Sequence, residues 1–364
     1  MQVTIVGLPG SGKTTVFNAL SGAHAETGAF SGGRAAPNVA VVKVPDERLD
    51  ALSALFHPRK TTPADVTYVD VAIPAGATRE GTIAPDVLAL VRNADALLHI
   101  ARAFEGGGAE RPADPWRDVA EMDLEFTVAD LDVIEKRLDK LRTSGRHGSP
   151  AEREQNALEE ELLARLEPQL SQGSPLRAMQ ISDDDERRLR GYRFLTQKPV
   201  LVLLNLDESR LGEAAVLEEA GRAHYTQPFS DVAALAGKIE AELAQLPPED
   251  AAPFMEDLGI AEPSRGRIIR LTYDLLGLFS FFTAGEDECR AWTLRRGATA
   301  VDAAGAIHSD LARGFIRAEV VTYPDLMAGG SIAEARKRGV LRSEGKTYQV
   351  RDGDVIQVLF NVAR

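Results

Sequence analysis

The sequence predicts an α/β fold, in which a mostly parallel sheet with helices on its faces is followed by a smaller β-rich module. Three observations support this prediction. Strand-like and helix-like segments alternate through residues 1–120, the first strand runs directly into a glycine-rich loop, and the chain changes to short strands after about Arg265. Alternation of this kind is typical of strands joined by helical crossovers, which make a sheet parallel.

The first strand and the loop after it form the clearest motif. Residues 2–6 are rich in β-branched side chains, and residues 7–14 fit the pattern G-x-x-x-x-G-K-[ST] before a helical segment. Glycines let such a loop turn its backbone N–H groups toward a phosphate, and the helix N-terminus adds partial positive charge. We therefore expect Lys13 to reach the β- and γ-phosphates of a nucleotide and the Thr14 hydroxyl to bind Mg²⁺. The expected nucleotide contacts from this motif are Pro9, Gly10, Ser11, Gly12, Lys13, Thr14 and Thr15.

The segments that follow continue the alternation. Strands are predicted at residues 39–44, 66–71 and 96–101, and helices at residues 45–56 and 83–93. Asp70 stands at the end of the second of these strands. A carboxylate there is placed to hold Mg²⁺ through a water molecule, so Lys13 and Asp70 are the predicted catalytic residues.

Residues 119–170 have the periodicity of amphipathic helices. Apolar side chains recur at steps of three and four from Leu124 to Leu141, and again from Leu158 to Leu170. Residues 144–150 (Ser-Gly-Arg-His-Gly-Ser-Pro) interrupt the pattern, which predicts an antiparallel helical hairpin. Each helix repeats for only about three heptads, too few to indicate an autonomous coiled coil.

A second buried strand is predicted at residues 198–204, because its apolar run is continuous. It ends in Asn205-Leu-Asp-Glu208, and residues 232–246 are predicted to form a helix that contains Gly237 and Lys238.

The C-terminal hundred residues predict a small β-grasp module. Strands are expected at residues 290–295, 316–321, 348–350 and 355–360, a helix at residues 299–307, and a turn at Arg351-Asp-Gly-Asp354.

Composition limits the kind of protein. A length of 364 residues predicts two or three domains, and 44% hydrophobic and 27% charged residues are ordinary for a globular chain. No apolar run approaches 18 residues, and strand-forming residues follow Met1 at once, which leaves no room for a signal peptide. A single cysteine, Cys289, cannot form an internal disulfide. We expect a cytoplasmic monomer without a membrane span.

The net charge of −13 is unevenly spread. Residues 265–364 contain 15 basic and 12 acidic residues, a net charge of +3, and the rest of the chain has a net charge of −16. This argues against broad nonspecific nucleic-acid binding, but leaves room for a local basic surface near the C-terminus. A mixed, solvated face is the alternative.

Several further stretches resemble one protein family. They are Val6-Gly-Leu-Pro9, Pro37-Asn-Val39, Val44-Pro-Asp-Glu-Arg-Leu49, Val69-Asp-Val-Ala72, Asn205-Leu-Asp-Glu208, Gly237-Lys-Ile-Glu-Ala-Glu-Leu243 and the C-terminal stretches 278–292 and 304–317. In order and spacing they are similar to the YchF-type branch of the Obg-like P-loop ATPases and GTPases, of the TRAFAC class. The C-terminal stretches resemble the TGS domain that closes these proteins.

The resemblance implies a Ras-like P-loop NTPase domain formed by residues 1–118 and 197–264. A helical hairpin insertion at residues 119–196 and a TGS-like β-grasp domain at residues 265–364 complete it. Family members bind and hydrolyse ATP, often in preference to GTP, and act with ribosomes. The resemblance thus implies a nucleotide-dependent molecular switch that uses Mg²⁺ and contacts the ribosome or RNA through a basic TGS surface. Candidate residues for that surface are Arg290, Arg295, Arg296, Arg313 and Arg317.

The base-reading motif favours adenine. GTPases usually have Asn-Lys-x-Asp, in which the Asp accepts two hydrogen bonds from guanine. Here Glu208, one methylene longer, takes the place of that Asp, and Leu206 replaces the Lys. A site that lacks its matched hydrogen-bonding group can lose several powers of ten in discrimination. We expect Asn205, Leu206 and Glu208 at the base, with Gly237 and Lys238 from the next loop.

Two departures from the family concern hydrolysis. Ile73, followed by Pro74, stands where the family has the Gly that turns its N–H toward the γ-phosphate, and Arg34 aligns with a threonine that completes the metal shell. Ile resists unusual backbone angles and Pro has no N–H. No glutamine follows to orient water, so we expect turnover no faster than the ~10⁻⁴–10⁻² s⁻¹ of Ras-like proteins without an activator.

Three functions therefore stay open: a slow ATPase switch, a catalytically degenerate ATP-binding adaptor, and a P-loop kinase of small molecules. The Asn205–Glu208 motif and the TGS-like tail disfavour the kinase.

Overall fold

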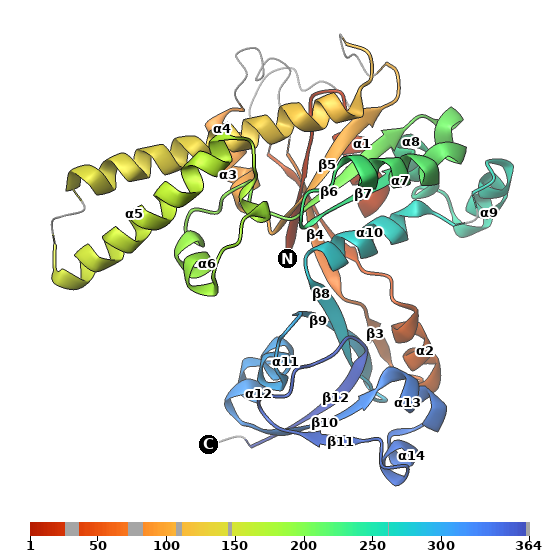
Figure 1. Cartoon of the computed structure of the whole chain (residues 1–364). Coiled ribbons are helices and arrows are strands. Elements are labelled where there is room, and N and C mark those ends of the chain that lie inside the picture. Colours follow the sequence, from red (N-terminus) through yellow and green to blue (C-terminus); the bar gives the residue numbers. More distant parts are fainter. Residues whose placement is uncertain (26–35, 72–82, 107–110, 145–147, 261, 362–364) are drawn as a thin grey trace. The chain divides into compact units, whose positions relative to one another are not determined.

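The structure is a computed structural model that describes residues 1–25, 36–71, 83–106, 111–144, 148–260 and 262–361 (Figure 1). The contacts within the chain divide it into two compact units. The first comprises Met1–Ala40 and Thr67–Arg265, and the second comprises Val41–Val66 and Gly266–Arg364.

The first unit is built on a six-stranded sheet with the strand order β2-β4-β1-β5-β6-β7. β1 pairs in parallel with β4 and β5, and parallel pairing continues from β5 to β6 and from β6 to β7. The predicted mostly parallel sheet is confirmed. Its strands are β1 (Gln2–Val6), β2 (Asn38–Lys43), β4 (Asp65–Asp70), β5 (Ala96–Ala103), β6 (Val200–Leu206) and β7 (Ser230–Leu235).

Helices cover the sheet because its strands are apolar on both faces. Side chains of α3, α4 and α7 pack on one face in a core that includes Val6, Val69, Leu97, Val202 and Val232. On the chain's first crossover, α1 contacts β1 and α8. The helices of this unit outside the hairpin are α1 (Lys13–Ser21), α3 (Pro85–Arg92), the 3₁₀ helix η2 (Glu208–Glu213), α7 (Ala214–His224), α8 (Gly237–Leu243) and α9 (Pro248–Asp257).

The predicted helical hairpin consists of α4 (Pro115–Ser144) and α5 (Pro150–Ser171), which lie side by side in Figure 1. A capping box begins α5, because the Ser149 side chain accepts from the Glu152 N–H and the Glu152 side chain accepts from the Ser149 N–H. The first half of α4 packs on the sheet, and its second half shares a separate leucine-rich core with α5. The short helices η1 (Leu176–Ala178) and α6 (Asp183–Leu189) complete this region.

The second unit contains a mixed six-stranded sheet with the strand order β11-β10-β12-β8-β9-β3. β8 and β9 form an antiparallel hairpin, β12 lies parallel to β8, and α11 packs on one face over an aromatic core, as expected for a β-grasp module. The strands are β3 (Lys60–Thr62), β8 (Leu278–Thr283), β9 (Glu288–Arg295), β10 (Phe315–Thr322), β11 (Arg342–Glu344) and β12 (Asp354–Phe360). The helices are α2 (Glu47–Phe56), α10 (Ser264–Leu275), α11 (Ala300–Ile307), α12 (Ser309–Arg313), α13 (Tyr323–Gly329) and α14 (Ile332–Lys337).

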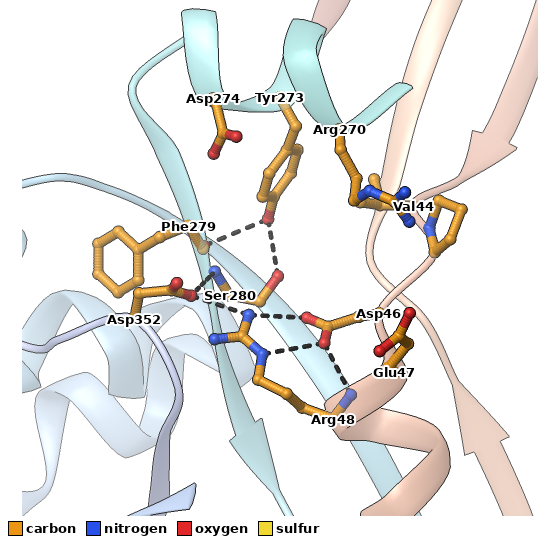
Figure 2. Close-up of a pocket in the computed structure, with 11 residues that line it drawn as sticks. Val44, Asp46, Glu47, Arg48, Arg270, Tyr273, Asp274, Phe279, Ser280 and Asp352 are labelled. Carbon is orange, nitrogen blue, oxygen red and sulfur yellow. Dashed lines mark hydrogen bonds and ion pairs between the residues drawn. The ribbon is translucent and has the colours of Figure 1, made fainter. Parts of the chain in front are cut away.

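Residues 41–66 group with the C-terminal residues, although the predicted boundaries place them in the NTPase domain. β3 pairs in parallel with β9. Arg48 donates to Asp46, two residues before it, and to Asp352, 304 residues after it (Figure 2). Such long-range pairing leaves no local signal in the sequence. A pocket of about 370 Å³ lies here. Among the lining residues drawn in Figure 2, the Tyr273 hydroxyl hydrogen-bonds with the Phe279 carbonyl and the Ser280 hydroxyl.

Two predicted elements differ in the structure. The helix predicted at residues 232–246 is wrong in its first part, because residues 230–235 form β7 and α8 begins only at Gly237. A short apolar run is compatible with either a buried strand or a helix, and here pairing with β6 decides it. The strand predicted at residues 348–350 is wrong, because only Gln349 pairs there, in an isolated β-bridge with Thr299. None of the helices in the described ranges is long and apolar enough to cross a membrane.

Candidate nucleotide-binding site

The glycine-rich loop joins the end of β1 to the start of α1, at the carboxyl edge of the parallel strands. Gly12 has a φ of +88°, and a Cβ atom there would lie 2.2 Å from the Asn205 amide nitrogen, so only glycine fits. The N-terminus of α1 has no side-chain cap. Backbone N–H groups at an uncapped helix N-terminus are donors for an anion, and the arrangement is suited to binding phosphate.

Lys13 is the first residue of α1, and its ammonium group folds back over the loop. Its Nζ donates to the carbonyl oxygens of Gly7 and Leu8, at 3.0 and 3.1 Å. Burial lowers the pKa of Lys13 to about 8, and the nearby Asp70 carboxylate partly opposes that shift. The cation is therefore poorly compensated within the protein and is suited to pairing with a phosphate.

Asp70, the last residue of β4, is hydrogen-bonded to Thr14 of the glycine-rich motif. The Thr14 hydroxyl donates to Asp70 Oδ2 at 2.8 Å, and the Asn38 side-chain amide donates to the same oxygen at 3.2 Å. Asp70 is 2% exposed, and its Oδ1 has no hydrogen-bond partner among the residues that the structure describes. A hydroxyl and a buried carboxylate with a free oxygen are the ligand types that Mg²⁺ prefers, so these residues fit the metal.

Asn205, near the end of β6, connects two loops. Its amide nitrogen donates to the Ser11 carbonyl at 2.9 Å, and its amide oxygen accepts from the Gly237 N–H at 3.0 Å. The side chain is 4% exposed. Asn205 thus fixes the phosphate loop relative to the start of α8, and both of its amide atoms already have partners within the protein.

The remaining predicted residues lie on the same edge with different exposure. Leu206 packs in the core beneath α3, α4 and α7, so its side chain is not available to a ligand. Glu208 begins η2 and is exposed, and Lys238 is exposed in the first turn of α8. The structure therefore brings together the loop, Asp70, Asn205 and Gly237, and leaves Glu208 and Lys238 as exposed charged groups.

Other predicted residues lie elsewhere. Arg34, Ile73 and Pro74 are outside the described residues. In the second unit, Arg290 stacks on Trp292, with 3.9 Å from the guanidinium carbon to the ring centre, and Arg313 pairs with Asp310. Arg295, Arg296 and Arg317 are exposed.

Two polar residues near the site, the partly buried Asn38 and the buried His99, were not predicted as functional. Asn38 stands in a quoted family motif, but nothing local in the sequence indicates its contact with Asp70. His99 lies on β5 beside Val6, the last residue before the loop. Burial, and then the positive charges of Lys13 and Arg177, lower the pKa of His99 to about 3, so the imidazole is neutral at neutral pH.

Family models match both parts of the chain. Residues 2–135 match a family described as 50S ribosome-binding GTPase, and residues 278–361 match YchF-GTPase_C, described as a protein of unknown function.

Whole-chain relatives agree with this. The chain is 38% identical to the ribosome-binding ATPase YchF of Bacillus subtilis and 36% identical to that of Escherichia coli O157:H7, in each case over 98% of both chains. Its fold matches the solved structure of the Schizosaccharomyces pombe YchF GTPase with a TM-score of 0.83 and 28% identity, over 99% of this chain and 97% of that one. The chain therefore belongs to the YchF family of P-loop proteins.

Proposed function

We propose that this protein is a ribosome-associated, Mg²⁺-dependent ATPase with slow intrinsic turnover, which acts as a nucleotide-dependent switch. The observation that supports this most is the convergence of the phosphate loop, Asp70 and Asn205 at one edge of the sheet. The names of relatives that match nearly the whole chain support ATP and the ribosome.

Each residue of the site has a proposed role. Backbone N–H groups from Gly10 to Thr15 bind the phosphates, Pro9, which has no N–H, lines the loop, and the Lys13 ammonium pairs with the β- and γ-phosphates. Thr14 binds Mg²⁺ directly and Asp70 binds it through water. When bound, Mg²⁺ neutralises charge on the phosphates. Binding and orientation by these groups supply the catalysis, because phosphoryl transfer needs little covalent chemistry from the protein.

Adenine is the proposed base. Glu208 is exposed just after β6, and its carboxylate has no hydrogen-bond partner among the described residues, so it is free to accept from the exocyclic amine of adenine. The longer Glu side chain does not reproduce the two-oxygen fit of Asp to guanine. Asn205 holds the phosphate loop against the start of α8. The backbone of Leu206, together with Gly237 and Lys238, completes the proposed base pocket.

The partner we propose is the ribosome, contacted through RNA by the basic residues of the C-terminal TGS-like domain. Arg295, Arg296 and Arg317 are exposed there. A ribosome partner places the protein in the cytoplasm, and we propose that it acts as a monomer.

An ATP-binding adaptor with little or no turnover is the second candidate, because Ile73 and Arg34 replace residues that the family uses around the γ-phosphate. In that case ATP is a structural or sensing ligand.

Equilibrium binding tests the nucleotide site that both candidates share, and does not distinguish one candidate from the other. We would measure the affinities of ATP, ADP, GTP and GDP for the wild type and for Lys13→Ala. The proposal predicts that ATP binds more tightly than GTP and that Lys13→Ala abolishes binding. Unchanged affinity in Lys13→Ala would exclude the assigned site.

A further inference from the structure

The Asp70 carboxylate is held by two donors on one of its oxygens. Oδ2 accepts from Thr14 at 2.8 Å and from Asn38 at 3.2 Å, whereas Oδ1 is buried and has no partner among the described residues. Thr14 belongs to the phosphate-loop motif. Asn38 lies outside that motif, which therefore assigns it no role in the site.

Two donors on Oδ2 fix the rotation of the carboxylate more tightly than one. An amide is neutral, so it orients the anion without competing with it for a cation. Hydrogen bonds to a carboxylate are also stronger than those between neutral groups. We propose that Asn38 is a positioning residue for the Mg²⁺ site, holding Asp70 so that Oδ1 is left to accept from metal-bound water. This inference rests on the proposed function of the site.

The position of Asn38 in the fold adds a consequence. Asn38 is the first residue of β2 and Asp70 is the last residue of β4, and the two strands are neighbours in the sheet. The amide therefore links the start of the edge strand β2 to the metal site. Binding of Mg²⁺ and the position of β2 should be coupled.

The test compares nucleotide affinity with and without Mg²⁺. We would titrate a fluorescent ATP analogue into the wild type and into Asn38→Ala, in EDTA and in excess Mg²⁺. We expect Asn38→Ala to reduce the Mg²⁺-dependent gain in affinity about tenfold, with affinity in EDTA unchanged within about twofold, because one hydrogen bond to a charged group is lost. Asn38→Gln keeps an amide donor and should recover part of the gain, and it tests the same inference if Asn38→Ala does not fold.

Asn18→Ala is the matched control. Asn18 lies on α1, the helix that follows the loop, and its amide makes two hydrogen bonds, to the backbone of Ala25 and not to Asp70. It should keep the full Mg²⁺ gain. An unchanged gain in Asn38→Ala, an equal loss in Asn18→Ala, or an equal loss of affinity in EDTA would overturn the role of Asn38. A wild type that binds no nucleotide in either condition would instead overturn the proposed function.

Discussion

At the scale of single residues, Glu208, the residue proposed to read the base, is one methylene longer than the Asp that GTPases usually have there. Glu208 is exposed and lies just after the strand that carries Asn205. Glu208→Asp would restore the Asp carboxylate that accepts two hydrogen bonds from guanine in GTPases. We predict that Glu208→Asp lowers the preference for ATP over GTP by about tenfold or more, because matched polar contacts discriminate strongly.

Competition of ATP and GTP for a fluorescent nucleotide measures this preference. Glu213→Asp, on the same 3₁₀ helix, is a matched control and should leave the preference unchanged. If Glu208→Asp leaves it unchanged as well, Glu208 does not read the base.

His99 predicts a dependence of stability on pH. Its pKa is about 3 in the folded protein, below the ordinary 6.5, so only the unfolded state takes up a proton between these values. Stability is full above pH 6.5 and falls as the pH drops toward 3, by up to about 1.4 kcal/mol per pH unit. His99→Leu should therefore reduce the loss of stability between pH 8 and pH 5.5 by about 1.4 kcal/mol.

Urea unfolding at the two pH values measures the difference. The chain has two tryptophans, Trp116 on α4 in the first unit and Trp292 on β9 in the second. In a Trp292→Phe background, fluorescence follows the unit that contains His99. An identical pH dependence with and without the imidazole would mean that His99 is protonated in the folded state.

At the scale of elements, Asn205 is the joint between the phosphate loop and α8. A Cβ atom on Gly237 would lie 2.8 Å from Asn205 Oδ1 and 3.1 Å from a Val16 methyl group. Gly237→Ala should displace the amide and weaken ATP binding about tenfold, because a buried hydrogen bond is lost or distorted.

Gly212→Ala supplies the comparison for that change, because a Cβ atom on Gly212 meets nothing within 4 Å. We would measure the ATP affinity of both alanine variants by isothermal titration calorimetry. The affinity of Gly212→Ala should equal that of the wild type. If the two alanine variants behave alike, the joint at Asn205 does not support binding.

The same elements show what sequence could predict. The loop from β1 to α1 and the turn before β12 were predictable because their signals are contiguous: glycines, a lysine, a threonine, or Asp-Gly between apolar runs. The contact of Asn38 with Asp70 and the pairing of β3 with β9 join residues distant in sequence. β7 was mistaken for helix, since four apolar residues fit either period.

At the scale of the whole molecule, the charge distribution favours nucleotide binding by one part of the chain and RNA contact by the other. The acidic remainder of the chain contains the site, and residues 265–364 have a net charge of +3. We predict that Arg296→Glu combined with Arg317→Glu weakens ribosome co-sedimentation about tenfold at low salt and leaves ATP affinity unchanged, because phosphate contacts depend on charge. Arg153→Glu, exposed on α5, is the control. Equal binding by all three proteins would place the ribosome contact on another surface.

The measurement that tests the central claim most directly is single-turnover release of phosphate from ATP by the purified protein, with Lys13→Ala alongside. Slow release at or below about 10⁻² s⁻¹ is expected from the wild type, with none from the variant, because the proposed role of Lys13 is to pair with the phosphates. If ATP binds but no Lys13-dependent phosphate appears, the ATPase account is contradicted and the adaptor is the better description.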